Sequence, residues 1–147
     1  MSDKASVPRI VVGVDGSESS EEALRWAVRQ AALVGATVDA LIAWDYPRVY
    51  GWPAPTVETF DYEENARKVL AETISKAVGP EPPVEISSLS IQGDPATALL
   101  DAARGATLLV VGNRGHGGFT GALLGSVSQR CVHHAHCPVV IVRDTST

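Results

Sequence analysis

The stretch of residues 107–127, TLLVVGNRGHGGFTGALLGSV, constrains the fold of this chain more than any other part of it. It opens with an apolar run, residues 108–111, that is too short for a helix and typical of a strand buried on both faces. The glycines that follow cost backbone entropy, which requires a physical reason. One such reason is a loop that presents backbone N–H groups to an anion. This reason fits here because a helical pattern begins at Ser126, and the start of a helix favours negative charge. These glycines are Gly112, Gly115, Gly117, Gly118, Gly121 and Gly125.

The spacing of these glycines differs from the two best-known phosphate-binding patterns. GxxxxGK[ST] is absent because the chain has no Gly-Lys pair, and GxGxxG is absent because Thr120 stands at its third glycine position. The spacing that does occur is Gly112-x-x-Gly115, nine residues, and then Gly125-Ser126. A strand, a glycine loop and a helix start in this order indicate a phosphate site. The alternative is a surface loop whose glycines only permit turns.

Apolar runs and helical patterns alternate along the chain, which predicts one α/β domain over residues 1–147. The expected architecture is an open five-stranded parallel sheet with helices on both faces. Ser19 and Glu22 predict a capping box for the first helix, and Asp94 is the expected N-cap of the third. Strands are predicted at 9–14, 37–44, 84–91, 108–111 and 138–143, and helices at 19–34, 58–78, 95–104 and 126–135.

Residues 45–57 and Phe60 carry two further expectations. The first segment is rich in aromatic residues and proline, so it is expected to be irregular. It either covers a ligand or partner site or packs locally as a surface loop. Phe60 is an expected inward position of the second helix.

Asp15 is the first acidic residue after the first strand. It follows the carboxyl end of that strand, which is where open α/β sheets bind ligands. We therefore expect Asp15 to face a ligand. The alternative role is that of a turn residue whose carboxylate bonds to nearby backbone.

Bulk properties exclude several classes of protein. The net charge is −5 and only three lysines occur, so a nucleic-acid partner is not expected. The sequence has no apolar run of membrane-spanning length and no signal-peptide core, which predicts a cytoplasmic protein. Cys131 and Cys137 are expected to be small buried residues. The histidines near them, His133, His134 and His136, lack the spacing of a metal site, so no metal site is predicted there.

Four features of this chain resemble, in order, those of the universal stress protein family. They are the strand end 14–17 (VDGS), the turn 93–95 (GDP), the glycine signature and the strand 137–142 (CPVVIV). The resemblance covers nearly the whole chain. It implies a Rossmann-like sheet of strand order 3-2-1-4-5, similar to the adenine nucleotide alpha hydrolase-like fold. In that order the first and fourth strands flank the crevice where a ligand fits.

The resemblance also implies an ATP site. In ATP-binding members the ends of the first and second strands hold adenine and ribose, and the signature holds ribose and phosphates. Arg114 or His116 is a candidate for added positive charge, or else a solvent-exposed loop charge. A divalent cation such as magnesium would offset phosphate charge, with Asp15 as a candidate to help. The implied site residues are Gly13, Val14, Asp15, Ala43, Gly112, Arg114, Gly115, Gly125, Ser126 and Val127.

The function predicted from this resemblance is ATP binding by a cytoplasmic stress-response sensor or regulator. A homodimer is implied through the last strand, whose apolar run 139–142 would leave an unpaired edge in a monomer. No catalytic residue is assigned, because GxSxG is absent and no side chain stands out as a water-activating base. The alternatives are a slow ATP hydrolase or nucleotidyl-transfer enzyme, and a dimeric interaction module that binds no nucleotide. AMP or a cyclic nucleotide also remains open as the ligand.

Overall fold

A computed structural model describes residues 7–49, 52–53, 60–113 and 124–143 of the chain. Its main sheet has five parallel strands in the order β5-β2-β1-β6-β7. Counted along the chain among themselves, these strands have the order 3-2-1-4-5, so the predicted topology is confirmed. The strands are β1 (Arg9–Val14), β2 (Thr37–Trp44), β5 (Ile86–Gln92), β6 (Leu108–Gly112) and β7 (Val139–Val142).

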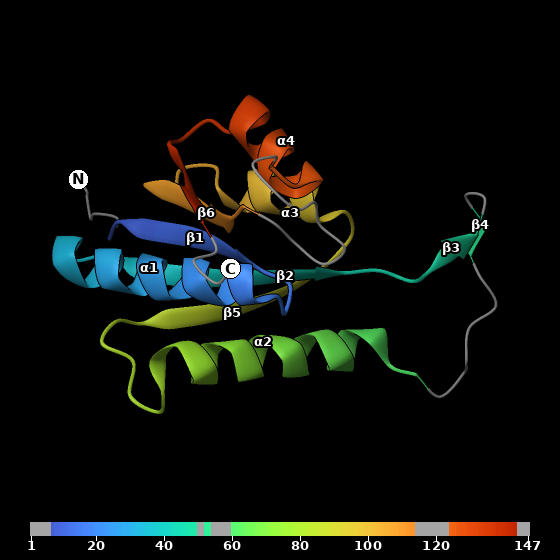
Figure 1. The fold of residues 1–147 in the computed structure, drawn as a ribbon, viewed down its shortest axis with the longest axis horizontal. Helices are drawn as coiled ribbons and strands as arrows, with labels where there is room; N and C mark the ends of the chain where they lie inside the picture. The colour runs from blue at the N-terminus through green and yellow to red at the C-terminus, as the bar shows by residue number, and fades with distance from the viewer. Residues whose placement is uncertain (1–6, 50–51, 54–59, 114–123, 144–147) are drawn as a thin grey trace.

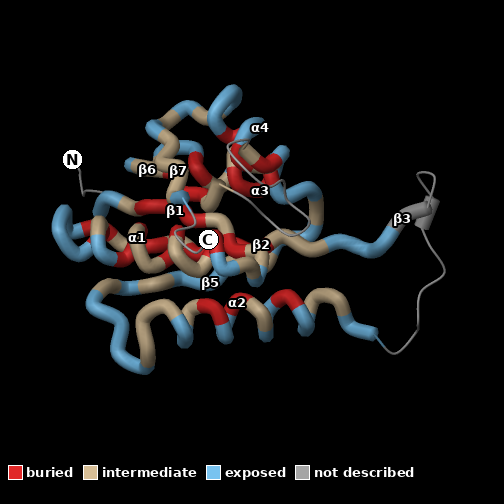
Figure 2. Tube along the Cα trace, in the orientation of Figure 1, coloured by how far each residue is buried: buried red, intermediate tan, exposed pale blue. Residues whose placement is uncertain are grey.

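Two helices cover each face of this sheet (Figure 1). The helices α1 and α2 pack on one face, and α3 and α4 pack on the other, which confirms the predicted layers. Figure 2 shows the buried residues concentrated along the inner faces of these elements. The helices are α1 (Glu18–Val34), α2 (Tyr62–Val78), α3 (Pro95–Ala102) and α4 (Ser126–His134).

Side chains along each strand alternate between the two faces, so two separate clusters form the core. Val12 and Val14 of β1 belong to the cluster under α1 and α2. Val11 of β1 and Val111 of β6 belong to the cluster under α3 and α4, together with Cys131. The prediction that Cys131 is a buried small residue is confirmed, since its exposed fraction is 0%. The same prediction is wrong for Cys137, which lies beyond the end of α4 and is only half-buried.

The first helix begins earlier than the capping-box pattern predicts. Its N-cap is Ser17, whose side chain accepts a hydrogen bond from the Ser20 N–H. The prediction that Ser19 is the cap is therefore wrong. Asp15 accounts for the difference, because its Oδ1 accepts hydrogen bonds from both the N–H and the hydroxyl of Ser17 and so favours the extended conformation that a cap needs.

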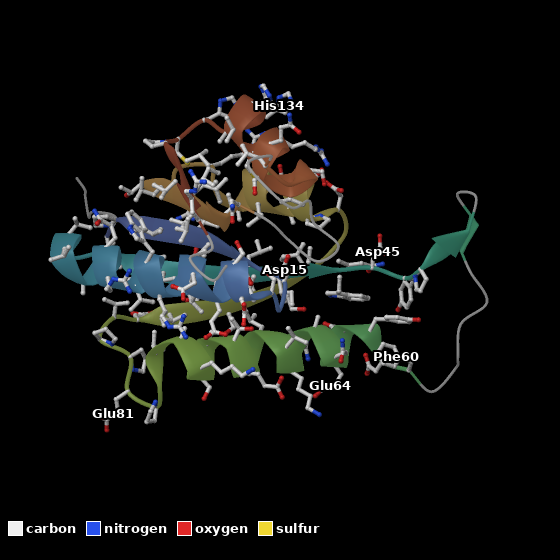
Figure 3. All side chains as sticks on the ribbon, in the orientation of Figure 1. Asp15, Asp45, Phe60, Glu64, Glu81 and His134 are labelled. Carbon is white, nitrogen blue, oxygen red and sulfur yellow. The ribbon has the colours of Figure 1, made fainter. Side chains whose placement is uncertain are left out.

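The second helix begins at Tyr62, with Asp61 as its N-cap. Phe60 therefore precedes the helix, and the prediction that it points inward is wrong. Its side chain is 47% exposed and packs edge-on against Tyr62, with the ring centroids 4.4 Å apart. Phe60 lies where the chain enters α2 (Figure 3).

A short hairpin lies in the segment that the sequence predicts to be irregular. Strand β3 (Arg48–Val49) pairs antiparallel with β4 (Trp52–Pro53), away from the main sheet in Figure 1. The prediction of an irregular segment is wrong at these four residues. Two residues separate the strands and the second is glycine, which is a common spacing for a hairpin connection. Proline is tolerated in a strand that has a free edge.

The two edges of the main sheet differ in chemistry. The edge strand β5 carries Ser87, Ser88 and Ser90, whereas the other edge strand, β7, consists only of valine and isoleucine. All four residues of β7 are half-buried. Within the described ranges, none of the helices has both the length and the apolar character needed to cross a membrane.

Candidate functional site

The carboxyl ends of β1, β2 and β6 bring several of the predicted site residues to one edge of the sheet. Val12 lies opposite Val110, so β1 and β6 are neighbours and end together at this edge. Val14 lies opposite Ile42, which puts Asp15 and Ala43 at the same level one residue further on. This edge, between β1 and β6, is where a sheet of this strand order is expected to bind a ligand.

Most of the predicted residues at this edge offer backbone atoms rather than side chains. Val14 is 4% exposed and its side chain belongs to the core under α1 and α2. A Cβ at Gly13 would lie 2.9 Å from Leu99 Cδ1, and a Cβ at Gly112 would lie 2.9 Å from the backbone of Ser19. These two glycines therefore allow helices to pack closely on the strand ends, in addition to any role toward a ligand.

Asp15 is engaged in a local turn. Its Oδ1 accepts hydrogen bonds from the Ser17 N–H at 2.9 Å and from the Ser17 hydroxyl at 2.5 Å, and its own N–H donates to Ser20 Oγ at 3.2 Å. This is the turn role that the sequence left open as the alternative. Asp15 also lies at the carboxyl edge, where β1 passes into α1 (Figure 3).

The four helix N-termini differ in how they are capped. Ser17, Asp61 and Asp94 each accept a backbone N–H with a side-chain oxygen at the starts of α1, α2 and α3. The N-cap of α4 is Gly125, which has no side chain, and the first turn of α4 contains no acidic residue. The first N–H groups of a helix have no acceptor within the helix. As far as the described residues show, the partial positive charge at the start of α4 is therefore the least offset of the four.

Hydrogen bonds hold together the two points where the glycine loop leaves β6 and enters α4. The Gly125 N–H donates to the Asn113 carbonyl at 2.9 Å, and the Ser128 hydroxyl donates to the Gly112 carbonyl at 2.5 Å. We call these four residues, 112, 113, 125 and 128, the loop stem. The Asn113 N–H also donates to the Val142 carbonyl at 3.0 Å, which joins the loop stem to the end of β7.

An ion pair connects α3 to α4. Asp94 Oδ2 lies 2.7 Å from Arg130 Nη1, and the same oxygen accepts hydrogen bonds from the N–H and the hydroxyl of Thr97 at 3.0 Å each. The Thr97 N–H and the Arg130 guanidinium together hold the pKa of Asp94 below its ordinary value. Both partners are about half exposed, so the pair fixes the helices without being buried.

Two of the predicted site residues, Arg114 and Gly115, lie outside the described residues, as does His116. In the part of the chain that the structure describes, no three His, Cys, Asp or Glu side chains come together as a group that could hold a metal ion.

Three residues were not assigned to this site from the sequence: Ser19, Asn113 and Ser128. Ser19 and Ser128 are polar yet only 3% and 4% exposed, and the Ser19 hydroxyl donates to Asn113 Oδ1 at 3.2 Å. Ser128 stands at the third helical position of α4, where a glutamate or glutamine would reach back to the N-cap of its own helix. Nothing in the local sequence shows that it reaches β6 instead.

Comparison with known proteins gives one family. Residues 7–143 match the model of the universal stress protein family. Among curated proteins, a universal stress protein of Mycolicibacterium smegmatis is 41% identical over 143 residues, which cover 90% of this chain and 47% of that relative. The chain spans about half the length of the curated relatives it matches.

Solved structures show the same fold. A crystal structure of a universal stress protein in complex with cAMP has a TM-score of 0.70 and 30% identity, and the match covers 95% of this chain and 98% of that one. A structure of the universal stress protein from Archaeoglobus fulgidus in complex with dAMP has a TM-score of 0.63 and 22% identity, covering 93% and 98%. At that lower identity the likeness supports the fold alone.

Proposed function

The chain belongs to the universal stress protein family, and from this premise we propose that it binds an adenine nucleotide, with ATP as the ligand. The relative whose structure contains cAMP is 30% identical over nearly the whole of both chains, which supports an adenine nucleotide as the class of ligand. In this proposal the ends of β1 and β2 contact adenine and ribose through Gly13, Val14, Asp15 and Ala43. The phosphates lie at the start of α4.

The observation that carries the proposal is the uncapped start of α4. Gly125, Ser126 and Val127 begin this helix without an acidic side chain in its first turn, whereas the other three helices begin with side-chain caps. An anion stabilises such a start through its N–H groups and the helix dipole. Ser126 is exposed and adds a hydroxyl at the same point. Gly112, Arg114 and Gly115 complete the proposed phosphate side, with a magnesium ion as a second component.

The remaining parts of the proposal concern the protein as a whole. Residues 1–147 would act as one domain of a cytoplasmic stress-response sensor or regulator, in which ATP shifts the population of conformations. The apolar edge strand β7 would pair with its counterpart in a second copy. Sedimentation velocity tests this part, because a mass that stays at 15.5 kDa at all concentrations would exclude the homodimer.

The variant Ser126→Asp tests the nucleotide site. A carboxylate at the first position of α4 would interact favourably with the helix dipole, so the thermal unfolding temperature should hold or rise slightly. The same carboxylate would repel the phosphates. We expect calorimetric titration to find ATP binding in the wild type and a loss of at least about tenfold in the variant.

The matched control is Asn65→Asp, which adds the same charge in an isosteric change at an exposed position of α2. Because α2 covers the other face of the sheet from α4, this variant should bind ATP as the wild type does. The proposal fails if the wild type binds no adenine nucleotide at millimolar concentration with magnesium present. The assignment of the phosphates to α4 fails if Ser126→Asp binds ATP normally.

A further inference from the structure

We infer that Ser128 is a positioning residue for the proposed phosphate site, an inference that rests on the proposed function. Its hydroxyl fixes the first turn of α4 against the end of β6, so that the N–H groups of that turn face the carboxyl edge of the sheet. Ser128 itself is 4% exposed and is directed toward the sheet rather than toward solvent.

The first step is that α4 has no side-chain cap to define where it begins. Gly125 has an extended backbone, φ −67° and ψ 165°, which any residue can adopt, so its conformation does not require a glycine. The direction of the helix start therefore depends on contacts with other elements. Two described hydrogen bonds hold this start to the end of β6: the Gly125 N–H donates to the Asn113 carbonyl, and the Ser128 hydroxyl donates to the Gly112 carbonyl.

The second step is that the Ser128 bond ends on a strand rather than on a loop. Gly112 is the last residue of β6, paired with Val142 of β7 in the parallel register. The Ser128 hydroxyl lies 2.5 Å from the Gly112 carbonyl, which the sheet holds in place. This bond therefore limits how far the first turn of α4 can move relative to β6. The neighbouring Asn113 is held by Ser19 from α1 and by the Val142 carbonyl, so its own carbonyl is a fixed acceptor for Gly125.

The third step concerns binding. When only a fraction of molecules holds the binding-competent arrangement, the apparent affinity falls by that fraction. Loss of the Ser128 hydroxyl would let the first turn of α4 take other orientations, while the next turn stays held by the buried Cys131 and by the ion pair of Arg130 with Asp94. ATP would then bind more weakly, because its phosphates would lose the aligned N–H donors of this turn. The affinity for a nucleoside would not change, because it has no phosphates.

The experiment compares Ser128→Ala with the wild type in two titrations, with ATP and with adenosine. We expect ATP affinity to fall about tenfold, from the loss of one buried hydrogen bond, and adenosine affinity to stay within about twofold. Ser75→Ala is the matched control, because Ser75 is an exposed serine of α2 and the change is chemically identical. Equal losses for ATP and adenosine would overturn the inference, since they would indicate only a general loss of structure.

A second readout does not depend on any ligand. Amide hydrogen exchange at Gly125 in the free protein reports whether its bond to Asn113 is held. We expect exchange at Gly125 to be at least about fivefold faster in Ser128→Ala than in the wild type or in Ser75→Ala. Unchanged exchange would overturn the inference even if ATP binds. If exchange is faster in Ser128→Ala but the wild type binds no nucleotide, then Ser128 does hold the start of α4 in place and only the proposed function fails.

Discussion

Gly112→Ala is the substitution whose effect on stability the structure predicts most directly. A Cβ at this position would lie 2.1 Å from Ser19 Oγ and 2.9 Å from both the carbonyl carbon and the carbonyl oxygen of Ser19. The hydroxyl can rotate away, but the two backbone atoms belong to the first turn of α1 and can move only with that helix. The methyl group would therefore push α1 away from β6.

The magnitude follows from two opposing effects. Forcing one extra carbon into a packed contact costs about 1–3 kcal/mol. Replacing glycine by alanine where the backbone permits it stabilises the folded protein by about 0.4–1 kcal/mol, because it lowers the conformational entropy of the unfolded chain. The net loss should be about 1.3 kcal/mol, which for a domain of this size lowers the unfolding temperature by about 3–5 °C.

Urea and thermal unfolding measure the loss, and two further variants test its origin. Gly13→Ala should cost less, because its nearest neighbour is the end of the Leu99 side chain at 2.9 Å, which can change rotamer. In a double-mutant cycle, Ser19→Ala should recover only part of the cost of Gly112→Ala, since it removes the hydroxyl and leaves the backbone atoms in place. Wild-type stability for Gly112→Ala, or full recovery in the double variant, would refute this reasoning.

Two other predictions concern charged and reactive groups. Asp94→Ala removes both the cap of α3 and the partner of Arg130, so stability should fall by about 1 kcal/mol in urea unfolding. The Thr97 N–H lowers the pKa of Asp94 in the folded protein, so the stability that Asp94 contributes is fully present above its ordinary pKa of 3.8. This stability is lost as the pH falls through the lowered pKa of the folded protein. If Asp94→Ala lost the same stability at pH 7 and at pH 2, the cap and the ion pair of Asp94 would not be its source. Burial raises the pKa of Cys131 to about 11, so at pH 8 only about one thiol in a thousand is ionised. Iodoacetamide followed by mass spectrometry should therefore label the half-buried Cys137 well before Cys131 in the native protein, and the reverse order would be inconsistent with this packing.

The order and faces of the main elements could be predicted because they depend on local patterns. Apolar runs ending at Val14 and Gly112, and helical periodicity between them, are enough to predict a parallel sheet with helices on both faces. The N-cap of α1 could not be predicted in the same way. Two serines, Ser17 and Ser19, both suit a cap, and the choice between them depends on Asp15 and on a contact with β6 that is distant in sequence.

The candidate site shows the same division. Glycines and a helix start were visible as a pattern, which led to Gly125 and Ser126. The residues that hold this pattern in place, Ser19, Asn113 and Ser128, resemble ordinary polar residues in the sequence. The partners in their side-chain hydrogen bonds lie 16 and 94 positions away along the chain, so only the folded structure shows that two of these side chains are buried and bonded.

The bond between Gly125 and Asn113 has a consequence for protein engineering. It brings together the two points between which residues 114–124 are inserted, using atoms that all lie outside the insert. The entropy of closing such an insert grows only slowly with its length, by about 0.6 kcal/mol for each doubling. Segments of other lengths should therefore be accommodated between Asn113 and Gly125 at a small cost in stability.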